Sequence, residues 1–346
     1  MTTTGQTVLI GASAGNDINS TDADGTILIG SQAGKYINSG IGNTAVGFET
    51  LTNEDDGDYS TAVGYQALSL QTGTSGEVGN SGFGYQAGYA MTTGTYDSLF
   101  GYKAGRNLNG GYRNTILGAR ALENSDEGHT LVAIGFDAMR FTEAGNQSVA
   151  IGQAALEYWS RDNNTSTHTT AIGDTAGKYT TGSYNTFVGS AAGQGGTTGA
   201  PYSSGENNVA VGYQALTAFT TAVGNTAIGY QASLDVTTGG YNTSLGYRAG
   251  YNITSGGNNT ALGAYALMNS QTISYDTAIG FGTLMDNTAG GSNVAVGWNA
   301  MNETTAAGSN VAVGYEALKW GTHARTIAIG YQAMYDTNAG STSMGS

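Results

Sequence analysis

The chain has 346 residues, including 57 glycines, one proline and no cysteine, and its formal net charge at pH 7 is −14. Without cysteine it has no disulfide framework and no thiolate metal site. Its 39% hydrophobic and 10% aromatic residues favour a folded chain over a disordered one, and no apolar run approaches the length of about 20 residues that a membrane helix needs.

The charge balance bears on partners. Only 11 Lys and Arg accompany 25 Asp and Glu. Phosphate backbones and anionic lipids are bound mainly through cations, so we expect no nucleic-acid partner and no membrane insertion. Residues 1–6 have no cationic start and no apolar run, which does not fit a secretory signal peptide. A protein made in the cytoplasm and released by lysis fits this start, as does a mature product.

A glycine preceded by an apolar residue recurs along the whole chain. Of the 19 intervals between successive glycines of this kind, 12 are 17 residues long, and the others are 15, 16, 16, 19, 20, 21 and 23. Such a fixed period is typical of a repeat architecture. We call these glycines the anchors: Gly11, Gly30, Gly47, Gly64, Gly84, Gly101, Gly118, Gly135, Gly152, Gly173, Gly189, Gly212, Gly229, Gly246, Gly263, Gly280, Gly297, Gly314, Gly330 and Gly345.

Residue types are fixed at set offsets from the anchor. A representative copy, from Asn208 to Leu216, reads Asn-Val-Ala-Val-Gly-Tyr-Gln-Ala-Leu. Three residues after the anchor Ala stands in 17 of 19 copies, and the next position is Leu or Met in 11 copies and Gly in 7. The apolar positions do not follow helical spacing, whereas short β-branched runs bounded by Gly, Asn and Thr are typical of strands.

One such unit cannot bury its own apolar stripe, but stacked units can. The sequence therefore predicts an all-β fold, a parallel β-solenoid of about 20 coils with a 17-residue period and about two short strands per coil. Residues 1–346 would form a single repeat domain. The Ala and Gly positions predict a thin coil whose walls lie close together.

The units reading Ala-Ile-Gly-Tyr-Gln-Ala, at Ala227 to Ala232 and Ala328 to Ala333, resemble the head repeats of YadA-type trimeric autotransporter adhesins. They resemble more closely the Asn-Thr-Ala-Val-Gly-Tyr-Gln-Ala-Leu arrays of bacteriophage tail fibres. The resemblance covers essentially the whole chain. It implies a left-handed β-roll, assembled as a homotrimer, that serves as a shaft or an adhesive head. The longer period and the lack of a stalk or anchor favour the fibre.

Twelve of the 20 residues directly after an anchor are aromatic. In a stacked solenoid these rings form a ladder, which would serve as intrachain stacking, as a seam between protomers, or as a strip for sugars. The aromatic ladder consists of Phe48, Tyr65, Tyr85, Tyr102, Phe136, Tyr213, Tyr230, Tyr247, Phe281, Trp298, Tyr315 and Tyr331.

Asparagine forms a second column, four residues before the anchor, which we expect to satisfy backbone groups. Its members are Asn43, Asn80, Asn114, Asn185, Asn208, Asn225, Asn242, Asn259, Asn293 and Asn310.

Catalytic and metal signals are weak, and the sequence predicts no catalytic residue, cofactor or metal. The Gly11 to Gly15 segment matches a nucleophile-elbow pattern only because it is the first repeat. His129, His168 and His323 have no triad or zinc spacing. The acidic stretch from Glu54 to Asp58 offers oxygen ligands for calcium, but it is better explained as a solvated turn.

Two long intervals predict extruded loops. The interval after Gly152 carries Tyr158, Trp159 and Arg161, a composition typical of interaction hot spots, so these residues are candidates for surface recognition. The interval after Gly189 is rich in glycine and holds the only proline, Pro201.

The sequence favours a non-enzymatic structural fibre protein of a virion or an extracellular appendage, located in a tail fibre or filament and attached to a host or surface. Its partners would be itself, as a homotrimer, and cell-surface glycans. Two alternatives stay open. One is a self-polymerising extracellular filament whose subunits join head to tail. The other is a carbohydrate- or ice-binding solenoid.

Overall fold

The computed structural model describes residues 6–18, 23–73, 76–160, 167–196, 199, 202–304, 308–321 and 324–336. Within these ranges the chain contains strands and turns and no helix. It divides into two compact units, residues 1–169 (unit 1) and residues 170–346 (unit 2). Both units repeat the same turn, whereas the single domain over residues 1–346 stays a prediction.

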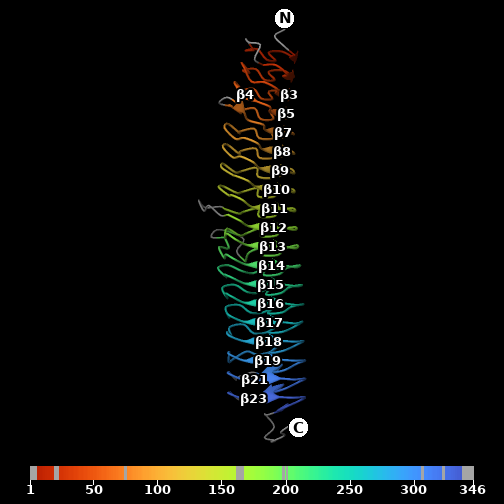
Figure 1. Cartoon of the computed structure of the whole chain (residues 1–346), viewed down its shortest axis with the longest axis vertical. Helices are drawn as coiled ribbons and strands as arrows, with labels where there is room; N and C mark the ends of the chain where they lie inside the picture. Colours follow the sequence, from red (N-terminus) through yellow and green to blue (C-terminus); the bar gives the residue numbers. More distant parts are fainter. Residues whose placement is uncertain are drawn as a thin grey trace. The chain divides into compact units, whose positions relative to one another are not determined.

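Unit 1 is built on nine parallel three-residue strands, each paired in register with the next (Figure 1). They are β1 (Val8–Ile10), β2 (Ile27–Ile29), β3 (Thr44–Val46), β5 (Thr61–Val63), β7 (Ser81–Phe83), β8 (Ser98–Phe100), β9 (Thr115–Leu117), β10 (Val132–Ile134) and β11 (Val149–Ile151). A side pair joins β4 (Gly57–Asp58) to β6 (Gly76–Glu77).

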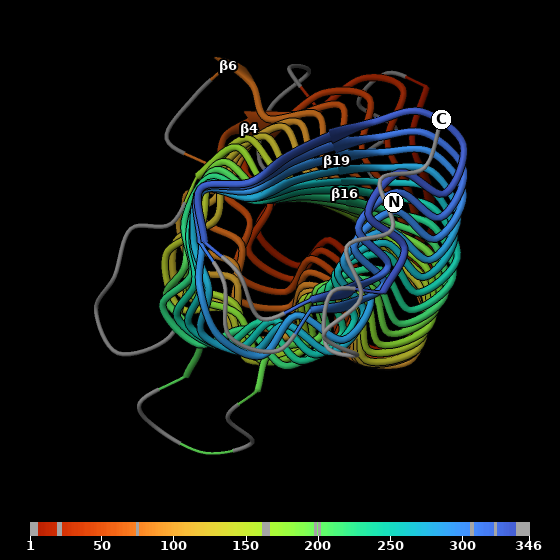
Figure 2. The same cartoon turned by 90° about the horizontal axis from the view of Figure 1, so that it is seen from below.

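Unit 2 has ten such strands, also parallel and in register. They are β12 (Thr170–Ile172), β13 (Thr186–Val188), β14 (Val209–Val211), β15 (Thr226–Ile228), β16 (Thr243–Leu245), β17 (Thr260–Leu262), β18 (Thr277–Ile279), β19 (Val294–Val296), β21 (Val311–Val313) and β23 (Ile327–Ile329). A side pair joins β20 (Glu303–Thr304) to β22 (Trp320–Gly321). In Figure 2 the blue turns of this unit overlie one another on one closed path.

The parallel β-solenoid and its period of about 17 residues are confirmed. The anchors directly follow these strands, and the twentieth anchor, Gly345, lies outside the described residues. The prediction of two strands per coil is wrong, because each turn has one regular three-residue strand. Six residues before the anchor, neighbouring turns also pair through isolated bridges, such as Tyr112 with His129 and Asn146 with Thr167.

The anchor glycine bends the chain at the end of each strand. At Gly118 φ is +140°, and a Cβ there would lie 2.4 Å from the carbonyl oxygen of Gly135, the next anchor. Only glycine fits both constraints. The backbone N–H of Gly118 donates to the carbonyl of Phe100 at 2.8 Å, so the bend keeps the turns hydrogen-bonded.

The residues two and four positions after the anchor also have positive φ, although most are not glycine. Examples are Gln66 at +53° and Leu68 at +50°. Because residues with positive φ alternate with residues of negative φ, this segment does not form an extended strand. Its N–H groups still donate to neighbouring turns, as Leu68 does to Ala87 at 2.9 Å. This local geometry explains why the predicted second strand is absent.

The core is a thin space between the two walls. The alanine three residues after the anchor and the middle strand residue are buried in nearly every turn, as Ala67 and Ala62 show. In many turns the positions four and seven residues after the anchor complement one another in size, although Leu216 and Phe219 are both large. Where the first is Gly105 the second is Leu108, and where the first is Leu122 the second is Ser125. Turns with this complementarity keep a similar total side-chain volume at the two positions.

The asparagine column is a buried hydrogen-bond ladder, as expected. Asn225 is typical: its Nδ2 donates to the carbonyl of Gly239 at 2.9 Å, and its Oδ1 accepts the N–H of Asn242 at 2.9 Å. Each amide thus satisfies a backbone carbonyl and an N–H that would otherwise be buried without a partner.

Candidate interaction surface

The outer face of the strands carries an aliphatic stripe that is exposed or half-buried in both units, beside a first position that is often Thr or Ser. The first and third residues of each strand point outward, and the third is always Val, Ile, Leu or Phe. Leu117 in unit 1 and Leu245 and Leu262 in unit 2 are among the exposed members. The aromatic residues after the anchors run beside this aliphatic stripe. We call the two stripes together the apolar face.

In unit 1 the aromatic ladder forms a continuous stack of four rings. The centroids of Phe48 and Tyr65 are 5.2 Å apart, those of Tyr65 and Tyr85 5.4 Å, and those of Tyr85 and Tyr102 5.3 Å. Ala119 then interrupts the stack. Beyond it, Phe136 lies under the Arg120 guanidinium, 4.5 Å from its ring centroid. The predicted stacking is confirmed in this run.

In unit 2 Tyr213, Tyr230 and Tyr247 stack at 5.4 and 5.2 Å, and Phe281 stacks on Trp298 at 4.2 Å. Between these runs the ladder position is Ala264, and the neighbouring Tyr265 contacts Tyr247 and Phe281 edge-on. A third run pairs Tyr315 with Tyr331 at 5.2 Å.

All twelve ladder rings are exposed, from 38% at Phe281 to 67% at Tyr331. Within a stacked run each inner ring has a neighbour against both faces, so only ring edges and hydroxyl groups meet solvent. A sugar ring stacks on a free aromatic face, which these inner rings do not offer. Edges beside aliphatic side chains suit a protein surface better.

A polar ladder, which the sequence analysis missed, lies beside the aromatic one, two residues after the anchor. In unit 1 Glu49 accepts Nε2 of Gln32 at 3.3 Å and of Gln66 at 2.7 Å, and Gln66 accepts Nε2 of Gln86 at 2.8 Å. In unit 2 Gln231 donates to Gln214 at 2.8 Å. The constant offset from the anchor is the signal that could have revealed it.

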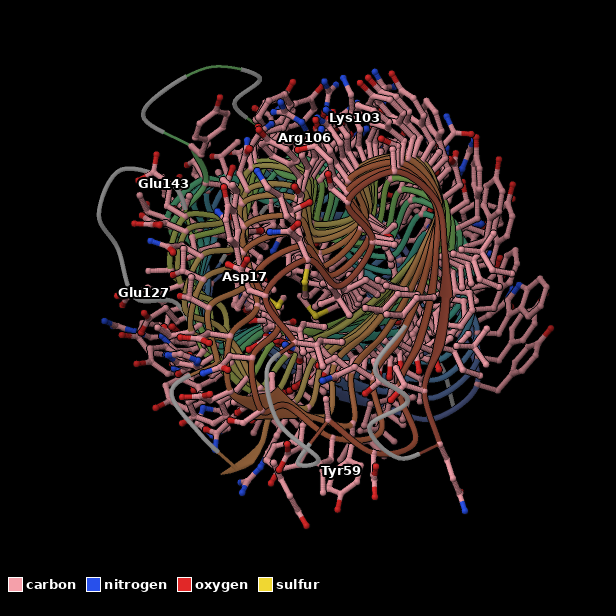
Figure 3. The ribbon with its side chains drawn as sticks, turned by 90° about the horizontal axis from the view of Figure 1, so that it is seen from above. Asp17, Tyr59, Lys103, Arg106, Glu127 and Glu143 are labelled. Atoms are coloured by element: carbon pink, nitrogen blue, oxygen red, sulfur yellow. The ribbon has the colours of Figure 1, made fainter. Side chains whose placement is uncertain are left out.

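Unit 1 also carries a group of paired charges on neighbouring turns. Arg120 contacts Asp137 at 2.7 Å, Arg140 contacts Glu123 at 2.9 Å, and Lys103 lies 3.8 Å from Glu123. Figure 3 labels Lys103 among the side chains on the outside of unit 1. Because these charges are matched within the unit, they do not form a free cationic patch.

A second set of exposed tyrosines stands five residues before the anchor. There Tyr59 lies against Gly42 and Tyr241 against Gly224, since a Cβ on either glycine would be 2.8 Å from Cδ1 of the ring. Tyr59 projects outward in Figure 3. The set comprises Tyr59, Tyr96, Tyr184, Tyr241 and Tyr275.

The structure corrects the candidate recognition loop. Trp159 is fully buried and packs against Gly145, so it is not presented at the surface. It stands seven residues after the anchor, where Leu108 is also buried. Tyr158 stacks on Phe141 with centroids 5.0 Å apart. Arg161 and Pro201 lie outside the described residues.

The acidic stretch is not a solvated turn throughout. Glu54 is fully buried, and its Oε1 accepts N–H groups of Gly57 at 2.8 Å and Gly73 at 2.9 Å. In the described part of the chain no three His, Asp or Glu residues gather as metal ligands. His129 stacks on Tyr112 at 4.2 Å, and His323 lies outside the described residues.

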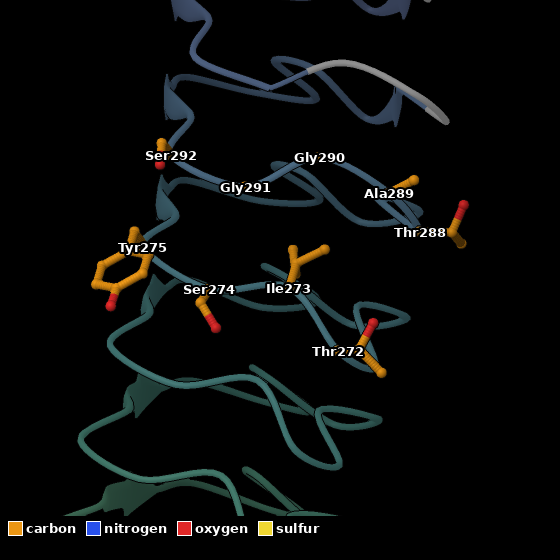
Figure 4. A pocket seen from close by; sticks show the side chains of 9 residues that line it. All are labelled: Thr272, Ile273, Ser274, Tyr275, Thr288, Ala289, Gly290, Gly291 and Ser292. Carbon is orange, nitrogen blue, oxygen red and sulfur yellow. The ribbon is translucent and has the colours of Figure 1, made fainter.

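A shallow depression in unit 2 lies between two successive turns (Figure 4). Gly290, Gly291 and Ser292 form its upper edge, and Ser274 and Tyr275 its lower edge. The hollow exists because the upper residues have small side chains. It brings together no acid, base or nucleophile pair.

Comparison with family models, curated proteins and solved structures finds no match to this chain. The resemblance to tail-fibre and adhesin repeats therefore stays a prediction. The described ranges contain no helix long and apolar enough to cross a membrane.

Proposed function

We propose that this protein is a structural shaft subunit that associates side by side with copies of itself through the apolar face. The supporting observation is that both units repeat in-register stripes on their outer face, with exposed aromatic rings beside aliphatic side chains that are exposed or half-buried. Monomeric soluble proteins rarely expose long contiguous apolar surfaces. The stacked aromatic edges fit a protein partner, and identical repeats on each copy allow the same contact on every turn.

This proposal includes the left-handed homotrimer that the sequence resemblance implies, in a virion fibre or an extracellular appendage that attaches to a surface without catalysis. Support for a structural role comes from how the polar groups are used. The asparagine ladder, the glutamine ladder and the paired charges all bind within the chain, as Asn225, Gln231 and Arg120 illustrate.

The test is the mass of the native assembly. We expect sedimentation at micromolar concentration to give a discrete oligomer, three chains if the trimer is correct. Replacing Leu245 and Leu262 together with lysine should yield monomers, because two charges would enter the apolar face. The matched control places lysine at Thr238 and Ser255, exposed residues on the same two turns, and should leave the oligomer intact.

A monomeric parent protein, or dissociation by both pairs of substitutions, would contradict side-by-side association. The head-to-tail filament and the carbohydrate- or ice-binding solenoid stay as alternative predictions. Electron microscopy would show filaments longer than one subunit for the first alternative. Thermal hysteresis would support ice binding.

A further inference from the structure

Two members of the buried ladder are aspartates. Asp97 in unit 1 and Asp276 in unit 2 stand four residues before their anchors, where the ladder otherwise often has asparagine. Both are almost fully buried. An asparagine at this position needs one acceptor atom and one donor atom, whereas an ionised aspartate offers acceptors only.

Asn114, on the turn after Asp97, shows what the position requires. Its Oδ1 accepts the N–H of Leu131 at 2.9 Å, and its Nδ2 donates to the carbonyl of Gly128 at 2.7 Å. A Cβ on Gly111 would lie 2.9 Å from that Nδ2 and 2.4 Å from the Gly128 oxygen. The Cβ position of this glycine, three residues before the ladder residue, thus lies close both to the donor atom and to the carbonyl oxygen that accepts from it.

Asp97 repeats only half of this pattern. Its Oδ1 accepts the N–H of Asn114 at 2.8 Å, but its Oδ2 is buried without a hydrogen-bond partner. A Cβ on Gly94 would lie 3.1 Å from Asp97 Oδ2 and 2.6 Å from the carbonyl oxygen of Gly111. The carboxyl oxygen thus occupies the donor's place and faces a carbonyl oxygen.

We propose that Asp97 is held as a neutral carboxylic acid whose Oδ2–H donates to the carbonyl of Gly111, making this turn of unit 1 sensitive to pH. Without that proton, two acceptor oxygens would face each other in an apolar interior. With it, the aspartic acid provides the same donor and acceptor as asparagine.

The surroundings favour the neutral form. Two apolar side chains lie beside the ladder here: Met91 on the turn of Asp97, and Leu108 on the turn of Asn114. The other charged side chains on this turn and the two adjacent turns include Glu77 and Arg113, which are exposed, and Lys103 and Arg106, which contact Glu123 and Gln86. The tyrosines of these turns, Tyr96 among them, are exposed or half-buried. Burial raises the pKa of Asp97 to about 7, although the hydrogen bonds from Asn114 act in the opposite direction.

Asp276 is the internal control, because a neighbouring amide compensates it. Asn287 Nδ2 donates to Asp276 Oδ2 at 2.8 Å and to the carbonyl of Gly290 at 3.0 Å. Asn293 also donates to the Gly290 carbonyl, at 2.9 Å. Burial raises the pKa of Asp276 to about 6, against hydrogen bonds from Asn293 and Asn287. This carboxylate has its donor and needs no proton to find a partner.

The sign of the pH effect follows from linkage. The pKa of Asp97 in the folded chain lies above its usual value of 3.8. Between these two values the unfolded chain has lost the proton that the folded chain keeps, so stability falls as pH rises. The contribution of Asp97 is complete below about pH 4 and is lost as the pH passes about 7.

The experiment compares Asp97→Asn with Asp276→Asn in the full-length protein. At about pH 8 we expect Asp97→Asn to raise the melting temperature of the transition that includes unit 1 by roughly 5 °C or more. At about pH 4 this gain should disappear. Asp276→Asn should give no such gain, because its new amide would face the donor amide of Asn287.

A direct reading comes from the side-chain carboxyl carbon of Asp97, followed by NMR in the intact protein. We expect its titration midpoint above pH 6 or so. A midpoint near the usual value, or equal effects of Asp97→Asn on melting at both pH values, would overturn the proposal.

Discussion

At the scale of single residues, the anchor glycine is the most constrained position of the repeat. The side chain of any other residue would meet the carbonyl of the next anchor in a backbone conformation that L-residues rarely adopt. Leu68 shows that positive φ alone is tolerated elsewhere in the same turn. The anchor differs from Leu68 in two ways, a φ near +140° and a close approach to the next turn's backbone, and both exclude other residues.

Gly118→Ala should destabilise unit 1 by about 3 kcal/mol or more, because strain at φ +140° adds to a 2.4 Å approach to the Gly135 oxygen. Gly110→Ala, eight residues earlier, is the control, since a Cβ there meets only Thr93 Oγ1 at 3.7 Å. Its effect should stay within about 0.5 kcal/mol. Urea unfolding followed by circular dichroism measures both, and equal stabilities would refute the anchor argument.

At the scale of one turn, the core balances large against small side chains. Leu99, the middle residue of β8, fills the space beside two glycines: a Cβ on Gly88 would lie 2.6 Å from its Cδ1, and a Cβ on Gly105 would lie 2.9 Å from its Cδ2. In other turns Ala takes the strand position and Leu takes the later one, as at Ala62 and Leu68. The two arrangements fill similar volumes.

A double-mutant cycle tests this compensation. Leu99→Ala should cost about 2–5 kcal/mol by leaving a cavity, and Gly105→Leu about 1–3 kcal/mol by overpacking. The double variant should be more stable than the sum predicts, by about 1 kcal/mol or more. Additive losses in urea unfolding would show that the two side chains do not share one space.

Offsets from the anchor predicted the strand, the buried alanines and the asparagine ladder, because those positions keep one residue type. They did not predict the second wall, because positive φ at Leu68 cannot be inferred from a leucine. The position of Trp159 was misjudged from the composition of its loop. Its offset, which is buried at Leu108, would have predicted a core residue.

For the molecule as a whole, uniform repetition also limits what the sequence can specify. A column of tyrosines predicts stacking but does not predict whether the stack faces the interior, a partner or solvent. The structure shows that the ladder is exposed in each unit. The inner rings of each stacked run have both faces covered by neighbouring rings, and this supports the proposed self-association over sugar binding.

Salt should distinguish an apolar contact from a charged one in that association. Each chain carries a formal charge of −14, so copies repel one another, and the apolar face offers no compensating ion pairs. Raising NaCl from about 20 mM to about 1 M shortens the screening length roughly from 20 Å to 3 Å. The repulsion weakens while apolar burial is retained, so we expect the oligomeric fraction in sedimentation to rise. Dissociation in high salt would instead indicate contacts made by charged groups such as Arg120 and Asp137, which are paired within unit 1.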